Sequence, residues 1–290
     1  MASLKEVKGR IATVNNTRKI TSAMKMVASA KLHKAQGVIA NMLPYEERLH
    51  RLLDNLLGSG VEVSTPYAEM RHEVKRVALV VCSSNSSLCG GYNANVIKHA
   101  GVLLKEYEKM GCENILIYAI GKKVADALTK QGYTLQGRYD DLSAKPSFAE
   151  AARLAEELMQ RFVSGEVDKV ELMYNHFKST STQILTNETY LPVSFASDTS
   201  EKVASENTDY ILEPSREELF TQLVPKVLRL KFYTMLLDSN ASEHAARTLA
   251  MQIATDNADD LMQELTLMYN KTRQQAITNE LLDIVGGSLA

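Results

Sequence analysis

Apolar residues recur at intervals of three and four at both ends of the chain, which is the periodicity of α-helices. Near the N-terminus this pattern runs from Leu4 to Leu56, and Pro44 falls inside it. Because the pattern resumes after Pro44 in "YEERLHRLLDNLL", we expect the proline to bend the helix rather than end it. The "GSG" at residues 58–60 ends the segment. The pattern therefore predicts a long N-terminal helix within residues 1–60.

The C-terminal part of the chain is helical in pattern over residues 213–290. Alternate steps of four and three from Leu223 predict a coiled-coil seam. His244 lies on this seam without a second metal-binding residue three or four positions away, so we interpret it as a packed helix residue. Many seam residues are small, which lets a partner helix approach closely but buries less apolar area in each layer. The seam consists of Leu223, Val227, Leu230, Thr234, Leu237, Ala241, His244, Thr248, Met251, Thr255, Ala258, Met262, Leu265, Tyr269, Thr272 and Ala276.

The middle of the chain alternates between β-rich runs and helical patterns. This alternation predicts a mainly parallel α/β sheet. The short "KSTS" between the last two runs predicts a hairpin. A polar, Ser-rich connector follows at residues 196–212. The expected strands are residues 76–83, 114–121, 167–177 and 182–193, and the expected helices are residues 92–110, 122–131 and 147–163.

These elements predict an α/β protein with a long α-helical antiparallel coiled coil. The N- and C-terminal helices, residues 1–60 and 213–290, pair with each other. A Rossmann-like α/β insert at residues 75–195 lies between them, followed by the connector. If both helices start level beside the insert, a rise of about 1.5 Å per residue makes the C-terminal helix overshoot by about 16 residues.

The overshooting end of the C-terminal helix is apolar on one side. Its apolar residues cover an arc of about 160° at 100° per residue, with Asn279, Glu280 and Asp283 opposite. A monomer would expose this face to water. We therefore expect another protein to enclose the tip, which consists of Ile277, Leu281, Leu282, Ile284 and Val285.

Charge is distributed unevenly along the chain, although the net charge is only -2. Residues 1–36 contain eight Lys and Arg residues against Glu6 alone, a local charge of +7. A solvated helix face is the simplest explanation, and attraction to an acidic partner is the more specific one. Nucleic acid ranks last, because this stretch has no aromatic residue to stack on bases.

The sequence also indicates a compartment. Cys82, Cys89 and Cys112 are an odd count without C-x-x-C spacing, so neither a disulfide frame nor a zinc site is expected, and a reducing cytosol fits them. We expect no membrane span and no N-terminal targeting segment, because the chain has neither an apolar run of about 18 residues nor a basic start followed by an apolar stretch.

The most tempting catalytic feature is "CSSNSSLCGGYN" at residues 82–93, a Ser- and Gly-rich turn after the first strand. It matches neither G-x-x-x-x-G-K-[ST] nor G-x-G-x-x-G, and no Lys stands beside the Gly pair. We interpret Gly90 and Gly91 as a tight turn into the next helix, with Asn93 or Ser residues capping backbone groups. The sequence therefore predicts no catalytic, metal or cofactor site.

Two long segments at the ends of the chain are distinctive, "KGRIATVNNTRKITSAMKMVASAKLHKAQ" at residues 8–36 and "ATDNADDLMQELTLMYNKTRQQAITNELLDIVGG" at residues 254–287. These two segments closely resemble the gamma subunit of F-type ATP synthases. The central "SSLCGGYN" and "DYILEP" also fit, so the resemblance spans the chain. One departure is Asn85-Ser86-Ser87, where the family commonly has an acidic residue, a basic residue and Gly.

The resemblance implies a non-catalytic rotor subunit of the central stalk, without a cofactor. Its coiled coil would turn inside a 3:3 hexamer of alpha and beta subunits, and the beta subunits would carry out ATP synthesis and hydrolysis. Its foot would join the epsilon subunit and the c ring, at the cytoplasmic face of the bacterial inner membrane. The complex would translocate protons or sodium ions.

The resemblance also assigns residues to the partners. Met24 and Lys25, with Arg273 and Gln274 on the facing helix, would form a neck that the beta subunits grip. Tyr210 and Glu213 would form the foot near the c ring. Two alternatives stay open at this point: an α/β nucleotide-binding enzyme with helical dimerisation arms, and a coiled-coil tether whose tip merely dimerises.

Overall fold

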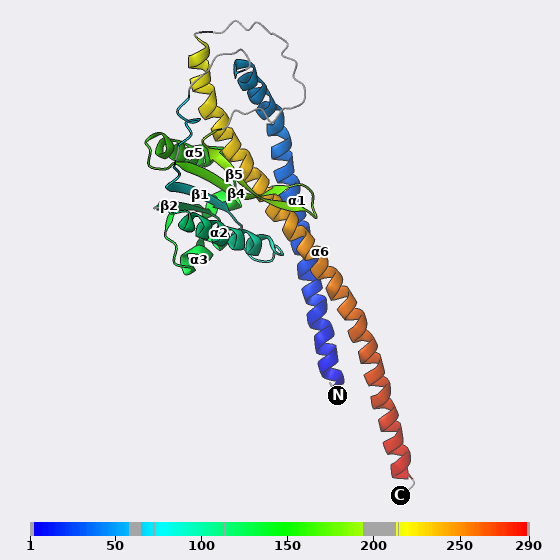
Figure 1. Ribbon diagram of the computed structural model, residues 1–290. Helices are drawn as coiled ribbons and strands as arrows, with labels where there is room; N and C mark the ends of the chain where they lie inside the picture. Colours follow the sequence, from blue (N-terminus) through cyan, green and yellow to red (C-terminus); the bar gives the residue numbers. More distant parts are fainter. Residues whose placement is uncertain are drawn as a thin grey trace. The chain divides into compact units, whose positions relative to one another are not determined.

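A computed structural model describes residues 3–57, 65–71, 73–112, 114–193, 213 and 215–288 (Figure 1). Contacts divide the chain into two compact units. The helical unit contains Met1–Ala30 and Arg247–Ala290, and the α/β unit contains Lys31–Ala246. The predicted division of the chain into four segments stays a prediction, because its boundaries fall near residues 58–64 and 194–212, outside the described residues.

Two long helices form the ends of the chain, as the apolar periodicity predicted. Helix α1 spans Leu4–Leu57, and helix α6 spans Arg216–Ser288. Helix α1 runs on through Pro44, which confirms that this proline does not end it. On α6 the predicted seam is buried or partly buried at every position from Leu223 to Thr272. The heptad prediction is therefore confirmed, apart from the exposed Ala276 at the end of the seam.

The α/β unit contains a five-stranded sheet in the order β3-β2-β1-β4-β5. Strands β1, β2, β3 and β4 are parallel, and β4 and β5 form the antiparallel hairpin that the sequence predicted. The predicted strands and helices were correct to within two residues. The strands are β1 (Arg76–Cys82), β2 (Asn114–Ile120), β3 (Leu135–Arg138), β4 (Lys169–Phe177) and β5 (Gln183–Leu191), and the helices are α2 (Tyr92–Lys109), α3 (Lys122–Lys130), α4 (Asp140–Ala144) and α5 (Phe148–Val163).

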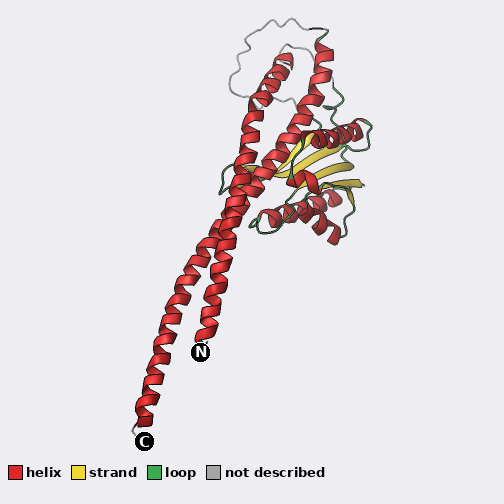
Figure 2. Ribbon diagram, turned by 180° about the vertical axis from the view of Figure 1, so that it is seen from behind, coloured by secondary structure: helices red, strands yellow, loops and turns green. Residues whose placement is uncertain are grey.

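Helices lie on both faces of the sheet (Figures 1 and 2), and an apolar core fills the space on each face. On one face α2 and α3 cover the sheet, with Val96, Leu104 and Leu128 buried against it. On the other face α5 and the first part of α6 enclose a larger core that includes Phe162 and Phe232. Helix α6 is thus a structural part of the α/β unit as well as of the helical unit.

Strand β3 and helix α4 were missed by the sequence analysis. Strand β3 is only "LQGR", an edge strand in which alternate residues are exposed and Gly137 weakens the β pattern. Helix α4 has five residues, of which Leu142 is buried. Neither element is long enough to show a period in the sequence.

An ion cluster holds the segment before β1 against β4. The carboxylate of Asp168 is 3% exposed and lies 2.7 Å from Arg71 Nη1 and 3.0 Å from Arg76 Nη2. It also accepts hydrogen bonds from the backbone N–H groups of Lys75 and Arg76. These side-chain and backbone donors outweigh the effect of burial and lower the pKa of Asp168 to about 2. The carboxylate is therefore ionised and fully hydrogen-bonded.

Candidate functional site

Within the helical unit, α1 and α6 run antiparallel and touch through polar groups as well as apolar ones. Arg18 Nη1 lies 2.9 Å from Asp259 Oδ1, and Lys25 Nζ donates to Gln252 Oε1 at 2.6 Å. Residue numbers rise along α1 as they fall along α6, which is the predicted antiparallel arrangement. The two helices thus pair in a single register in this unit.

On α1, several of the residues buried in this contact are not the large apolar residues of the helix. Its most buried positions include Val7, Thr21 and Ala28. Ile20 and Val27 are 60% and 58% exposed, one residue away from the buried positions. Steps of four and three from Val7 pass the partly buried Ile11 and Val14 and then reach Thr21 and Ala28, so the seam is apolar at its start and small or polar further along. This face leaves the larger apolar side chains directed outward, where a partner could contact them.

The predicted neck residues do not lie at one level of the helix pair. Met24 and Lys25 are partly buried, and Lys25 contacts Gln252. Arg273 and Gln274 are exposed. The separation from Gln252 to Arg273 is 21 residues of one continuous helix, or about 30 Å along its axis. The four residues therefore lie at two levels of the helix pair, and their contact with partners stays a prediction.

The end of α6 extends past the start of α1. Lys25 pairs with Gln252 and Arg18 with Asp259, so Leu4 is level with about residue 273. About 15 residues of α6 then have no α1 beside them, close to the predicted overshoot. The predicted tip residues are between 48% and 67% exposed, namely Ile277, Leu281, Leu282, Ile284 and Val285. Within the part of the chain that the structure describes, nothing covers this apolar face.

The predicted foot is described only in part. Glu213 is exposed. Tyr210 and the predicted connector lie outside the described residues.

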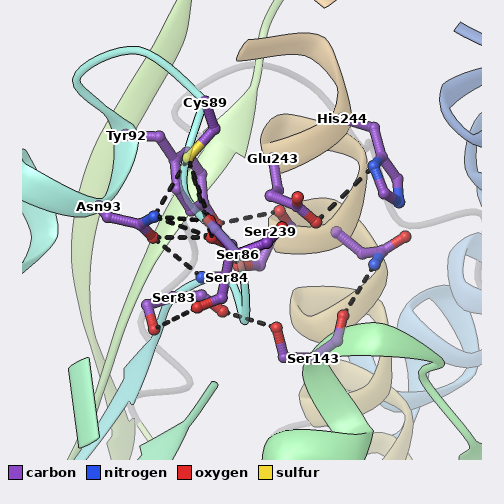
Figure 3. A network of polar contacts seen from close by, with 11 residues as sticks. Ser83, Ser84, Ser86, Cys89, Tyr92, Asn93, Ser143, Ser239, Glu243 and His244 are labelled. Carbon is purple, nitrogen blue, oxygen red and sulfur yellow. Dashed lines mark hydrogen bonds and ion pairs between the residues drawn. The ribbon is translucent and has the colours of Figure 1, made fainter. Parts of the chain in front are cut away.

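The Ser-rich turn between β1 and α2 binds its own polar groups (Figure 3). Asn93 Oδ1 accepts the Ser84 N–H at 3.1 Å, and Asn93 Nδ2 donates to the Ser86 carbonyl at 3.2 Å. Gly90 has a φ of 59°, so the tight turn at this glycine is confirmed. Asn93 bonds backbone groups of the turn, as expected, but the N-cap of α2 is Gly91 and receives no side-chain hydrogen bond. Leu88 also has a positive φ, 68°, and is exposed, which the sequence did not predict.

The space beside this turn is small. A cavity of about 10 Å³ lies between the turn and α6, lined by residues that include Ser83, Tyr92 and Glu243. This volume is about that of one water molecule. Burial raises the pKa of the Cys82 thiol at its edge to about 12, so the thiol stays protonated.

Sequence reasoning missed a group of polar residues where α6 crosses the sheet. Asp238, Ser239 and Asn240 each hydrogen-bond to another element of the α/β unit, at Phe177, Tyr92 and Ser143. The partners of Ser239 and Asn240 are far away in the sequence, so no local pattern points to these contacts. One signal of these contacts is present in the sequence: three polar residues stand in a row between the seam residues Leu237 and Ala241.

The fold and these surfaces define a class: two long, antiparallel helices that carry an inserted α/β unit and leave an apolar helix end uncovered. A family model described as ATP synthase matches residues 3–290. ATP synthase gamma chains from Phocaeicola vulgatus and Bacteroides thetaiotaomicron are 62% and 58% identical, with all of this chain and all of each relative covered. The chain belongs to the family of ATP synthase gamma chains.

Solved structures share this fold. A chain of the Euglena gracilis mitochondrial ATP synthase is 21% identical with a TM-score of 0.64, covering 99% of this chain and 93% of that one. A chain of the Tetrahymena thermophila enzyme, from a structure of its central stalk and c ring, is 22% identical with a TM-score of 0.59 and covers 81% of this chain and 99% of that one. The predicted fold class, family and rotor-subunit role are confirmed.

Proposed function

We propose that this chain is the turning shaft of its complex, coupling ion-driven rotation of a c ring to ATP synthesis and hydrolysis in an alpha/beta hexamer. The observation that carries this proposal is the uncovered end of α6, where five apolar side chains face water in the single chain. Enclosure by a sleeve of partner subunits would remove that apolar area from water.

The charge on α1 supports an acidic partner around the shaft. Lys5, Lys8 and Lys19 are exposed and have no ion pair among the described residues. Arg18, by contrast, faces Asp259 within the chain. Unpaired cations attract acidic loops over about a Debye length, so salt should weaken the attraction. We propose the beta subunits as the source of these loops.

We also propose that the chain is not itself the catalyst. The polar groups of the Ser-rich turn are engaged with one another, as in the contact of Ser84 Oγ with the Ser86 carbonyl at 2.6 Å. A nucleotide phosphate would need those backbone and hydroxyl groups as donors. Catalysis then belongs to the beta subunits, and this chain supplies force and position.

The remaining contacts follow from the same proposal. Met24, Lys25, Arg273 and Gln274 would meet the beta subunits at two levels, and Tyr210 and Glu213 would face the c ring and the epsilon subunit. No helix among the described residues is long and apolar enough to cross a membrane. We propose a peripheral position at the cytoplasmic face of the bacterial inner membrane, with membrane contact only through the complex.

Co-purification tests this function. A tagged chain should be recovered from detergent-solubilised membranes with alpha, beta and epsilon subunits and the c ring. In parallel, the isolated folded chain is titrated with ATP and with NAD. Tight binding of either at residues 82–93 would favour the nucleotide-binding enzyme, and a stable symmetric dimer without other subunits would favour the tether.

A further inference from the structure

Three successive residues of α6 hold three different elements of the α/β unit. Asp238 contacts the end of β4: its Oδ1 accepts the Phe177 N–H at 2.8 Å, and its Oδ2 lies 2.6 Å from His176 Nδ1. A backbone N–H at the end of a strand cannot swing away as a long side chain can. This contact therefore fixes α6 against the hairpin.

The next two residues reach α2 and α4. Ser239 Oγ lies 3.0 Å from Tyr92 Oη, and the Ser239 carbonyl accepts from the same hydroxyl at 3.1 Å (Figure 3). Asn240 Nδ2 donates to the Ser143 carbonyl of α4 at 2.9 Å. Ser239 and Tyr92 are buried, so water does not compete for their contact.

The spacing of these residues places the contacts around the helix. Successive residues of an α-helix differ by 100°, so the three contacts span about 200° of the circumference. Ala241 and Ala245 face the remaining side and pack against Leu32 and Ala35 of α1. The helix is therefore enclosed at this level, and directional hydrogen bonds point outward from it in three directions.

Such an arrangement resists rotation of the helix. Apolar contacts, such as those of Phe232 and Leu236 with the sheet, resist separation but permit small sliding and rolling movements. Hydrogen bonds depend on angle and distance, so rotation of α6 about its axis would break them. The ion pairs of Lys231 with Glu188 and Arg229 with Glu156 are more exposed and hold less firmly.

We propose that Asp238, Ser239 and Asn240 form a rotational clamp, which fixes the angle of α6 about its own axis relative to β4, α2 and α4 of the α/β unit. They are positioning residues. Because of their contacts, force passes between α6 and the sheet and helices around it without rotation of α6 about its own axis. This proposal rests on the proposed function, since only a turning shaft loads such a clamp.

The test uses the assembled, rotating complex. A bead is attached through Cys112, which is partly exposed whereas Cys82 and Cys89 are buried, with alpha and beta subunits that lack reactive cysteines. The angular spread of the bead is measured while the complex pauses between steps. Replacing all three residues by Ala should broaden this spread, and Tyr92→Phe should broaden it less. Asp238→Asn, which keeps an oxygen for the Phe177 N–H, should broaden it less than Asp238→Ala.

Ser143→Ala is the matched control. It removes the bond from Ser143 Oγ to the Ser83 carbonyl but leaves the Ser143 carbonyl that Asn240 uses. The wild-type spread is expected for this variant. A wild-type spread in the triple variant, or equal broadening in the Ser143→Ala control, would overturn the clamp. A wild-type complex that does not rotate would instead overturn the proposed function. Circular dichroism of each isolated chain checks that the variants fold. If the triple variant does not fold, the Tyr92→Phe variant alone tests the clamp.

Discussion

The hydroxyl oxygens of Thr21 and Thr255 lie 2.8 Å apart, where α1 meets α6 in the helical unit. Each hydroxyl also lies within hydrogen-bond distance of a carbonyl of its own helix, at Arg18 and Met251. Two hydroxyls carry two protons, so when one hydroxyl donates to the other, only one of the two carbonyls accepts a hydrogen bond. Thr21 is buried in this contact and Thr255 partly so. A polar pair thus occupies a layer of the seam that would usually be apolar.

This pair predicts non-additive substitutions. Thr21→Val alone should destabilise the chain by about 1 kcal/mol, because it removes the contact across the two helices and leaves the Thr255 hydroxyl with only the Met251 carbonyl of its own helix. The double change to Val should cost less than the sum of the single changes, since both polar groups are then replaced by side chains of the same shape. Urea denaturation followed by circular dichroism measures this. Thr17→Val, at an exposed hydroxyl that bonds Thr13, is the control. Additive costs would contradict an interacting pair.

Asp168 predicts a dependence of stability on pH. Its pKa is lowered from 3.8 to about 2 in the folded chain, so its contribution is fully present above the unfolded value of 3.8 and is lost as the pH falls toward 2. Asp168→Asn should cost about 3 kcal/mol at neutral pH, because Arg71 loses a buried partner. It should also remove part of the pH dependence, as measured by denaturation at pH 7 and pH 3.

The neighbouring ion pair of Glu73 and Lys75 offers a matched control for Asp168. Both side chains are largely exposed, so solvent screens their attraction. Glu73→Gln should leave the midpoint of denaturation nearly unchanged at either pH. If Asp168→Asn and Glu73→Gln lowered the stability equally, the hydrogen bonds of Asp168 would not be what stabilises the segment before β1.

Long periodic features could be predicted from the sequence, and short or cooperative ones could not. The heptad from Leu223 and the alternation of strands with helices each extend over many residues, so single exceptions did not hide them. In contrast, the α1 seam uses Thr21 and Ala28 while Ile20 and Val27 point outward, because a thin two-helix contact favours small residues. Apolarity alone therefore indicated the helix but not its buried face.

The polar contacts of α6 were beyond sequence reasoning for a different reason. Asp238 bonds the end of β4 and Asn240 bonds α4, and each pairing exists only once the sheet has formed. The neck illustrates the same limit. Lys25 and Arg273 both match motifs, yet only the register of the two helices shows that they lie at different levels.

We expect that substitution of Arg273 lowers coupled ATP turnover while the chain still folds. Its side chain is exposed on the part of α6 near the start of α1. If a carboxylate of a beta subunit accepts a hydrogen bond from it, Arg273→Ala should lower coupled ATP turnover about tenfold, which corresponds to about 1.4 kcal/mol. The helicity of the isolated chain should not change. Lys271→Ala, at an exposed residue two positions away, is the control. Wild-type turnover in Arg273→Ala would refute the assigned contact.

The apolar tip predicts that assembly depends on one face of the end of α6. Replacing Leu281 and Ile284 by Asn removes two apolar side chains from the surface that the sleeve would enclose. Burial of each contributes about 1.5 kcal/mol or more, so binding of the chain to alpha and beta subunits should weaken about 100-fold. Truncation after Asn279 should weaken it further and leave the fold of residues 76–193 intact.

The opposite face of the same helix end supplies the control. Glu280→Gln and Asp283→Asn change two residues of similar exposure and leave the apolar face untouched. Assembly is measured by titrating the labelled chain into alpha and beta subunits and separating the complex by size. Weakening by the Leu281 and Ile284 changes alone is the expected result. If both pairs of substitutions weaken assembly equally, the tip acts through helix stability or charge, and an enclosing apolar sleeve is not required.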